Sequence, residues 1–504
     1  MEVAQHTMLS RRKGGKLDSV TTISGNQDNC VLFVVREVES KEDNNIFFCR
    51  CFAFFQAESG GLFSTDIRSN HNRSIQMFCN QCEQTQNGHG CTDVGVCGKD
   101  EDVQSLQEIL LYGLKGMAAY ANHARRLGKS DDSVSAFIEE ALFATMTNVN
   151  FDLESLFELV LECGHKNVRV MQLLDEGHTE RFGTPTPTTV YEGTKAGPGI
   201  LVTGHDMVDL GDLLDQCAGQ GINVYTHGEM LPAHSYPKLR AHAHLAGHFG
   251  GPWQNQHWEF PSFTGPIVAT TNCILIPPDS YKDRLFTTRV TAVPGAKRLK
   301  SNDFSEVIAA AKTLPSLPER KVRESTIGFH HSVILGLADK IVEAVKSGSI
   351  QRFYLIGGCD GAEMGRNYYT KLAHQAPEQS VILTLGCGKY RIRNHEYGTV
   401  AGLPRLLDMG QCNDAYGAVQ VAIGLSKAFN CGINDLPLEI VLSWFEQKAV
   451  AVLLSLFALG VKGIRLGPVP PAFVSPNIFR ILQEKFDLKL IEAEPPMELV
   501  TLGT

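Results

Sequence analysis

Short apolar runs alternate with helical stretches throughout residues 185–504, and this alternation limits the folds open to the chain. Eight runs are typical of buried strands: GILVTG (199–204), INVYTHG (222–228), PIVATTNCILI (266–276), RFYLIGG (352–358), SVILTLG (380–386), LLDMG (406–410), LEIVLSWF (438–445) and GIRLG (463–467). Strands that alternate with helices form parallel sheets with helices on both faces. The segment is too long for one such sheet, so we expect two Rossmann-like α/β domains, with a seam in the proline-containing stretch 312–325.

Residues 102–177 have a helical pattern instead. Apolar residues recur at spacings of three and four in VQSLQEILLYGLKGMAAYANHARRL, VSAFIEEALFATMTN and DLESLFELVLECGHKNVRVMQLLDEG, as expected of amphipathic helices. Caps between them are expected at 131–133 and 150–152. The sequence thus predicts a multidomain protein of a helical part followed by two α/β parts. Its expected divisions are a leader (1–76), a helical bundle domain (77–184) and α/β domains over 185–325 and 326–504.

Residues 1–76 differ from the rest of the chain. A basic start with Arg11 and Lys16 gives way to a polar stretch that contains acidic residues, and helical periodicity is weak. Transit peptides are poor in acidic residues. We interpret the leader as a disordered or poorly packed extension, either a transit segment or a segment absent from the mature protein.

Composition excludes several kinds of partner. The formal net charge is −9 and there is no long basic tract, so neither nucleic acid nor an anionic membrane surface is an expected partner. No apolar run reaches the roughly 18–20 residues that span a bilayer. The chain has 14 cysteines, but it is long and shows no secretory signal pattern. We therefore expect metal ligands or buried thiols rather than disulfides.

Chemically active side chains follow seven of the predicted strands. In chain order they are His205, Glu229, Cys273, Cys359, Cys387, Cys412 and Glu446. Ligands bind open parallel sheets at the carboxyl ends of the strands. A single cysteine or histidine at such a place is usually a core or hydrogen-bonded residue, but seven together predict a site. Thiolates suit iron–sulfur, copper or zinc, and carboxylates favour harder, oxygen-bound metal.

Four further cysteines lie close together in the stretch 77–101, namely Cys79, Cys82, Cys91 and Cys97. Their spacing is C-x2-C-x8-C-x5-C. Such a cluster is consistent with a structural zinc ion, with two disulfides or with an iron–sulfur electron carrier.

At these residues the chain resembles the hybrid cluster protein family, also called prismane proteins or hydroxylamine reductases. The resemblance covers residues 77–504. Its segments are FCNQCEQT, GCTDVGVCGK, VTGHD, VYTHGEMLPAH, TTNCI, IGGCDG, LGCGKYR, GQCNDAY and SWFEQKAV. Only 108 positions separate Cys97 from His205, which resembles the shortened subgroup with a single helical bundle. The leader matches nothing in the family, whose members begin at a methionine such as Met77.

The resemblance implies two iron–sulfur centres. A 4Fe-4S cubane would be held by the four N-terminal cysteines, whose spacing resembles the four-iron type. A hybrid 4Fe-2O-2S cluster would be held by the seven strand-end residues, with Cys359 as a persulfide. The implied reaction is reduction of hydroxylamine to ammonia and water. Glu229, Glu446 and Lys448 are the candidate catalytic residues, and Lys448 would supply a proton or steady negative charge, unless it is an ordinary surface lysine.

Electrons are expected from a partner protein, a ferredoxin or a reductase, because GGCDG and LGCGK lack the G-x-G-x-x-G spacing of nucleotide-binding loops. Oxygen-sensitive clusters point to the cytoplasm, with a mitochondrion-related organelle or plastid as the alternative that the leader leaves open. Six histidines at 227–257 are interpreted as hydrogen-bonding and proton-relay residues near Glu229 rather than as a metal-storage tract. Cys163 and Cys217 are expected to be core thiols.

Three other functions remain open from the sequence. A carbon monoxide dehydrogenase-like nickel–iron enzyme has a related fold, but its site is richer in sulfur, which Glu229 and Glu446 argue against. A nitric oxide reductase, or a protein S-nitrosylase acting in nitrosative stress, could use the same cluster. A structural zinc ion at the N-terminal cysteines is the simplest alternative.

Overall fold

The computed structural model describes residues 6–11, 17–24, 30–35, 38–39, 48–49, 52–53, 77–85 and 88–502. The chain divides into two compact units, Met1–Ser74 and Ile75–Thr504. In the first unit, β1 (His6–Arg11), β2 (Leu17–Ser24), β3 (Cys30–Val35) and β6 (Phe52–Ala53) form an antiparallel sheet in that order, and β4 (Val38–Glu39) pairs with β5 (Phe48–Cys49). Strands here differ from the disordered extension that the sequence suggests. Runs such as VTTI and VLFVV are rich in residues that favour strands.

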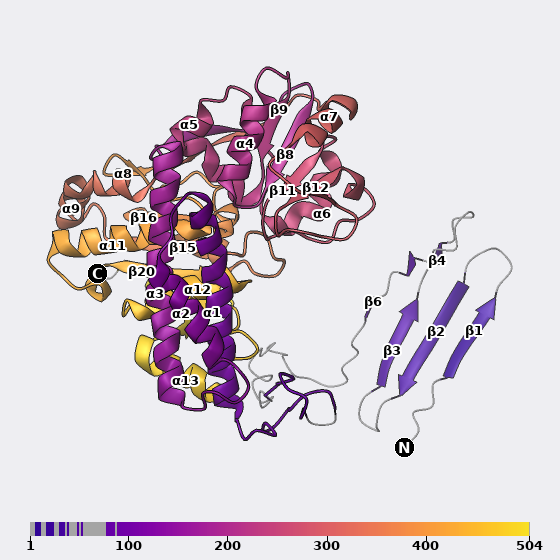
Figure 1. Ribbon diagram of the computed structural model, residues 1–504, viewed down its shortest axis with the longest axis vertical. Coiled ribbons are helices and arrows are strands. Elements are labelled where there is room, and N and C mark those ends of the chain that lie inside the picture. The colour runs from indigo at the N-terminus through magenta and orange to yellow at the C-terminus, as the bar shows by residue number, and fades with distance from the viewer. Residues whose placement is uncertain are drawn as a thin grey trace, which may run out of the picture. The chain divides into compact units, whose positions relative to one another are not determined.

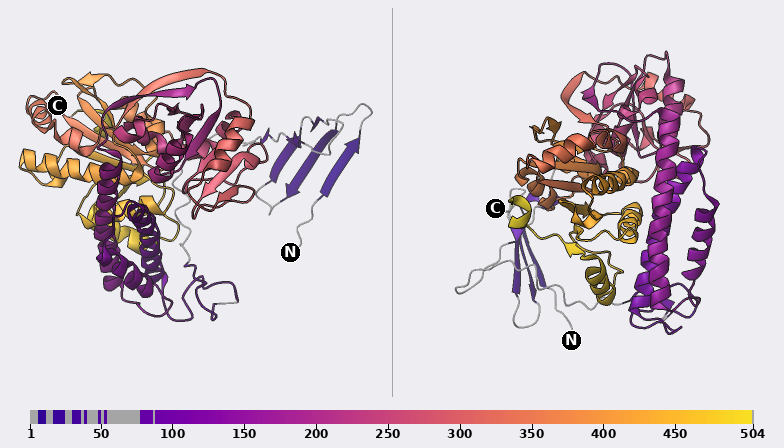
Figure 2. Two further views of the ribbon diagram at one scale, coloured as in Figure 1. Left: turned by 45° about the horizontal axis from the view of Figure 1, so that its top comes forward. Right: turned by 90° about the vertical axis from the view of Figure 1, so that its left-hand side faces the viewer.

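The second unit begins with the predicted helical bundle. Helices α1 (Glu101–Arg126), α2 (Asp132–Ala144) and α3 (Leu153–Phe182) occupy the three amphipathic segments. Asp131 and Asp152 cap α2 and α3 by accepting backbone N–H groups of Ser133 and Ser155, so the caps predicted between the helices are confirmed. Helix α3 runs past both α/β parts (Figures 1 and 2).

A fourth helix from the far end of the chain completes the bundle. Helix α12 (Gln447–Ala458) packs against α1 and α3 at two glycines. A Cβ at Gly116 would collide with the Gln447 carbonyl oxygen, and one at Gly164 would collide with that of Leu454. These glycines allow the backbones to approach closely. Because Glu446 and Lys448 stand at the start of α12, the bundle fixes both residues.

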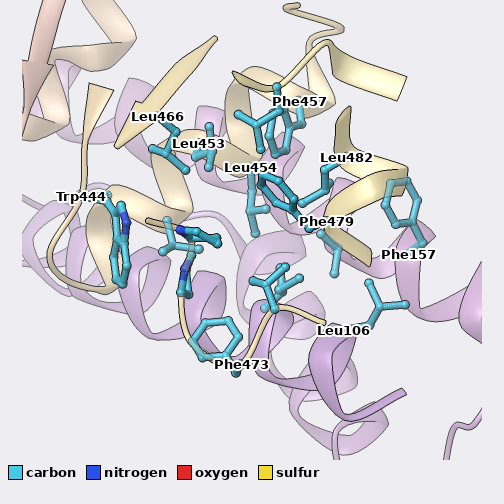
Figure 3. Close-up of a pocket in the computed structure, with 18 residues that line it drawn as sticks. Leu106, Phe157, Trp444, Leu453, Leu454, Phe457, Leu466, Phe473, Phe479 and Leu482 are labelled. Atoms are coloured by element: carbon cyan, nitrogen blue, oxygen red, sulfur yellow. The ribbon is translucent and has the colours of Figure 1, made fainter. Parts of the chain in front are cut away.

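The bundle shares its hydrophobic core with the second α/β part. One continuous cluster joins buried residues of α1 and α3 to residues of α12 and α13 (Pro476–Phe486) and to the strands of the second sheet. A cavity of about 40 Å³ remains where these helices meet, and apolar side chains such as Leu106, Phe457 and Leu482 line it (Figure 3). The helical domain and the second α/β domain are therefore packed together rather than separated by a linker.

The first sheet has eight strands. In spatial order they are β13 (Lys297–Leu299), β12 (Leu285–Thr288), β11 (Ile267–Ala269), β8 (Gly199–Thr203), β9 (Asn223–Thr226), β10 (Leu245–His248), β7 (Thr188–Thr194) and β14 (Arg320–Ile327). All neighbours are parallel except β14, which pairs antiparallel with β7. Strand β14 overlaps the predicted seam, so the chain leaves this sheet only after Ile327. Helices α4 (Met207–Cys217), α5 (Pro237–Arg240), α6 (Gln256–Glu259) and α7 (Ser305–Thr313) connect its strands.

The second sheet has six parallel strands. In spatial order they are β19 (Leu406–Asp408), β16 (Ser380–Gly386), β15 (Arg352–Gly358), β20 (Leu438–Ser443), β21 (Arg465–Gly467) and β22 (Lys489–Leu490). Its other helices are α8 (His331–Leu335), α9 (Ala338–Lys346), α10 (Tyr368–Gln375), α11 (Ala415–Phe429) and α14 (Met497–Val500), and β17 (Thr399–Val400) pairs with β18 (Leu403–Pro404). All eight predicted strands exist, although β11 is shorter than its apolar run and leaves Cys273 in the following loop.

Candidate metal centre

The residues that follow seven strands converge between the two sheets. Three follow β8, β9 and β11 of the first sheet, and four follow β15, β16, β19 and β20 of the second. His205, Glu229 and Cys412 bring their ligand atoms within 4.8 Å of one another, which joins the two sheets at one place. The other four, Cys273, Cys359, Cys387 and Glu446, interact electrostatically with members of this group. The structure therefore gathers all seven residues that the sequence singles out.

Local backbone geometry brings the thiols together. Gly386, at φ 68°, precedes Cys387, and a Cβ there would lie 2.9 Å from the Gly358 carbonyl oxygen. The ends of β15 and β16 can thus lie close, which brings Cys359 near Cys387. Cys273 has a left-handed backbone with φ 65°, a conformation that costs a non-glycine residue roughly 1–2 kcal/mol and that concentrates at functional sites.

Hydrogen bonds orient the imidazole of His205. Its Nδ1 lies 2.9 Å from the hydroxyl oxygen of Thr271, which also accepts the backbone N–H of His205 at 2.8 Å. If Nδ1 carries the proton and donates it to Thr271, Nε2 presents its lone pair to a metal. This Nε2 lies 4.0 Å from Oε2 of Glu229, a separation that one ion can bridge.

Backbone and amide groups hold Glu229 beside Cys412. The backbone N–H of Cys412 donates to Oε2 of Glu229 at 2.9 Å, and the Gln411 amide donates to the Glu229 carbonyl oxygen at 2.7 Å. The same amide reaches the carbonyl oxygen of His205 at 3.2 Å. Oε1 of Glu229 is buried and has no hydrogen-bond partner within the described part of the chain.

The site has an excess of buried acidic groups. Burial raises the pKa of the Cys273, Cys359 and Cys387 thiols strongly, and it raises the pKa of Cys412 to about 11 although Lys448 lowers it. None of these thiols is in a disulfide. Burial also raises the pKa of Glu229. A cationic metal centre would stabilise the thiolates and carboxylates, so the donor set and the unpartnered Glu229 oxygen fit a metal cluster with a sulfur-rich part and an oxygen-bound part.

Lys448 is buried in this site and is not the surface lysine that the sequence left as an alternative. Burial disfavours its charge, but the acidic groups of Cys412, Glu446, Cys273 and Glu229 together outweigh that effect and raise the pKa of Lys448. Its Nζ lies 5.7 Å from the ring centre of Tyr120 on α1. The Tyr120 hydroxyl donates a hydrogen bond to the sulfur of Cys412 at 3.2 Å.

The N-terminal cysteines lie in an irregular loop. Cys79 and Cys91 form a two-residue antiparallel bridge, with backbone hydrogen bonds of 3.0 and 2.7 Å. Both residues are buried, Cys82 is half-buried and Cys97 is exposed. The bridge brings the first and third cysteines of the motif together. That the four cysteines hold an iron–sulfur cluster rather than a zinc ion stays a prediction.

Three of the six histidines at 227–257 are buried beside Glu229. His227 Nε2 is within hydrogen-bond distance of Glu259 Oε2, at 3.0 Å. The hydroxyl oxygen of Thr226 lies 2.9 Å from both His234 Nε2 and His248 Nδ1. His248 in turn lies 3.1 Å from the hydroxyl of Tyr390. The other three, His242, His244 and His257, bond elsewhere. Among the residues that the structure describes, none of the six belongs to a metal-binding group, which agrees with the hydrogen-bonding interpretation.

Sequence reasoning missed the residues that support the ligands. Tyr120, Thr271 and Gln411 are ordinary polar residues in the sequence, although Thr271 and Gln411 stand close to ligands in the segments TTNCI and GQCNDAY. Lys389 is the supporting residue that the sequence could most easily have revealed, because it follows Cys387 in the segment LGCGKYR. It is fully buried and donates to Asp408 at 2.6 Å and to the Gly410 carbonyl oxygen at 2.7 Å. Cys163 and Cys217 are buried on helices, as predicted.

Comparison with known proteins tests the resemblance. The model of the Prismane/CO dehydrogenase family matches residues 77–159 and 152–494. The chain belongs to this family. A hydroxylamine reductase of Moorella thermoacetica is 58% identical over 415 residues, which cover 82% of this chain and 97% of that protein. One of Geobacter metallireducens is 55% identical over 389 residues, covering 77% and 71%. The predicted family is confirmed.

Solved structures of carbon monoxide dehydrogenases share the fold of this prismane-family chain. Carbon monoxide dehydrogenase IV from Carboxydothermus hydrogenoformans has a TM-score of 0.67 at 16% identity and covers 86% of this chain and 92% of its own. A carbon monoxide dehydrogenase from Thermococcus sp. AM4 has a TM-score of 0.68 at 17% identity, covering 85% and 89%. The multidomain α/β prediction is confirmed, and membership of the family implies that the chain binds iron–sulfur clusters. Within the part of the chain that the structure describes, no helix has the length and apolarity that crossing a bilayer needs.

Proposed function

We propose that the chain is a hydroxylamine reductase, which converts hydroxylamine, two electrons and two protons to ammonia and water. The convergence of His205, Glu229 and Cys412 from the two sheets, with three further thiols and Glu446 beside them, carries the proposal. Relatives more than half identical to this chain bear the name hydroxylamine reductase. Glu229 and Glu446 supply the hard oxygen donors that distinguish the site from an all-sulfur one.

These seven residues are proposed to hold the hybrid 4Fe-2O-2S cluster, with Cys359 as its persulfide. When bound, such a cluster supplies Lewis acidity at the N–O bond and a store of electrons. The chain's own residues do the rest. Thr271 and Gln411 orient His205 and Glu229, and the burial of Cys359 and Cys387 keeps bulk water from these two thiols.

Lys448 is the proposed proton donor to the leaving oxygen. Its ammonium group is buried among Cys412, Glu446, Cys273 and Glu229, which stabilise the protonated form. A charged donor in a dry pocket interacts strongly with negative charge that develops on a substrate oxygen. The buried histidines near Glu229 are proposed to carry replacement protons through Thr226 and Tyr390.

Cys79, Cys82, Cys91 and Cys97 are proposed to hold a 4Fe-4S cluster that passes electrons to the hybrid site. The exposed Cys97 places one edge of this motif at the surface, where a ferredoxin or reductase could dock. We propose the cytoplasm as the compartment.

An anaerobic assay tests the proposed reaction. The reduced holoprotein should form one ammonium ion per hydroxylamine consumed, and Cys387→Ser should abolish this turnover, whereas Cys431→Ser, in a loop away from the site, should retain it. Ammonium formation that is equal in the two variants contradicts the proposal. Parallel assays with nitric oxide and a nickel determination test the alternatives. Much faster consumption of nitric oxide would make nitric oxide the substrate in place of hydroxylamine. Stoichiometric nickel would indicate a carbon monoxide dehydrogenase-like enzyme instead.

A further inference from the structure

A second group of metal-ligating side chains lies outside this centre. Asp175 on α3 and the consecutive residues His330 and His331 at the start of α8 each offer one ligand atom, and these atoms all lie within 4.8 Å of one another. His330 Nε2 is 3.0 Å from Asp175 Oδ1, and the two imidazole centroids are 3.9 Å apart. We propose that these three residues bind a divalent transition-metal ion of the zinc class.

The donor set suits such an ion. Two imidazoles and one carboxylate are ligands that zinc accepts, and a fourth position is commonly filled by water. In a tetrahedral site with zinc–ligand distances near 2.1 Å, neighbouring ligand atoms lie about 3.4 Å apart. The separation between His330 and Asp175 is already close to this value, so small side-chain rotations complete the geometry.

Ser332 can fix His330 in the ligating state. Its hydroxyl oxygen lies 2.8 Å from His330 Nδ1. The backbone N–H of Ser332 also lies 3.3 Å from this Nδ1 and donates to it when the ring proton is on Nε2. In the other tautomer, Nδ1–H donates to the hydroxyl oxygen and Nε2 has a free lone pair directed at Asp175, the arrangement that metal-bound histidines usually have. Without an ion, Nε2–H donates to Asp175 instead, and metal binding then moves the single ring proton from Nε2 to Nδ1.

His331 has a ring nitrogen without a use in the fold. Its Nδ1 is buried and lacks a hydrogen-bond partner among the described residues, an arrangement that costs stability. The ring packs edge-on against Tyr416 at 5.8 Å between centroids. In the part of the chain that the structure describes, no lysine or arginine forms an ion pair with Asp175, which contacts the imidazole of His330. A metal cation would therefore meet no competing lysine or arginine at Asp175.

The site's position suggests its role. Strand β14, the last strand of the first sheet along the chain, ends at Ile327. Helix α8, the first helix of the second α/β part, begins at His331. An ion held by Asp175 and both histidines would tie this crossover to α3 of the bundle. The proposed ion is thus structural, and it is independent of the hydroxylamine chemistry.

Zinc binding by the anaerobic holoprotein tests the inference. After equilibration with Zn²⁺ and removal of excess, wild type should keep about one zinc per chain, and Asp175→Asn and His331→Gln should each weaken binding at least about tenfold. His374→Gln is the matched control, because His374 and His395 also pair closely, at 4.4 Å between ring centroids, and belong to no metal-binding group among the described residues. Iron content and melting temperature check that each variant folds.

X-ray absorption at the zinc edge identifies the ligands. Nitrogen and oxygen neighbours with imidazole scattering, lost in His331→Gln, support the site. Sulfur neighbours would mean zinc in cysteine sites lacking iron, and retention equal in His331→Gln and wild type would mean an adventitious ion only. Either of these results, or no retained zinc, overturns the proposal.

Discussion

The hydroxyl of Tyr120 lies 3.2 Å from the sulfur of Cys412, although the two residues are 292 positions apart in the chain. The contact links α1 of the bundle to the end of β19 in the second sheet. Hydrogen bonds to sulfur ligands help to set the reduction potential of an iron–sulfur centre, because they stabilise the more negative, reduced state.

Replacing Tyr120 by phenylalanine should therefore lower the reduction potential of the hybrid site and reduce turnover about tenfold. A redox titration followed by electron paramagnetic resonance measures the potential. Tyr112→Phe is the control, since this tyrosine is also on α1 but packs against Phe473. An unchanged potential in Tyr120→Phe would show that the contact does not act on the cluster.

Lys448→Met should lower kcat for hydroxylamine by a factor of about 100 or more, because a positioned proton donor contributes that much. Iron content should stay at the wild-type level, since Lys448 is not among the proposed ligands. Steady-state kinetics and an iron assay on the same samples separate the two effects. Lys462→Met, beyond the end of α12 and exposed, should behave like wild type. Full activity of Lys448→Met would remove Lys448 from the mechanism.

Gly164→Ala should destabilise the protein by at least about 2 kcal/mol, because the added methyl group meets the backbone of α12 at Leu454. It should also disturb Glu446 and Lys448, which stand at the start of that helix. Thermal unfolding followed by circular dichroism measures the loss, with Glu158→Ala on the exposed face of α3 as the control. Equal melting temperatures would mean that α12 is not packed as described.

Buried His178 should make the fold sensitive to acid. Burial lowers its pKa from an ordinary value of 6.5 to about 4, so the unfolded chain takes up a proton before the folded chain does. Stability should then be complete above pH 6.5 and fall as the pH drops towards 4. In urea unfolding between pH 7 and pH 5, His178→Phe should lose less stability than wild type. Equal losses would assign the acid sensitivity to other groups.

Much of this architecture could be predicted from the sequence because it follows local rules. Cys359, Cys387 and Cys412 were identifiable because the carboxyl ends of parallel strands meet at one edge of a sheet. The supporting contacts were not identifiable in this way. Gln411 reaches His205 across 206 positions, and Gly116 makes room for a helix whose residues come more than 300 positions later. No periodicity within a short window contains such pairings.

The central claim is that two separate groups of residues each hold an iron–sulfur cluster. Iron analysis with electron paramagnetic resonance, on anaerobically purified wild type, Cys387→Ser and Cys82→Ser, tests it most directly. We predict about eight irons per chain in wild type, with each variant losing about half of them together with a different resonance signal. A colourless protein that contains zinc, or an iron content that neither substitution changes, would contradict the account.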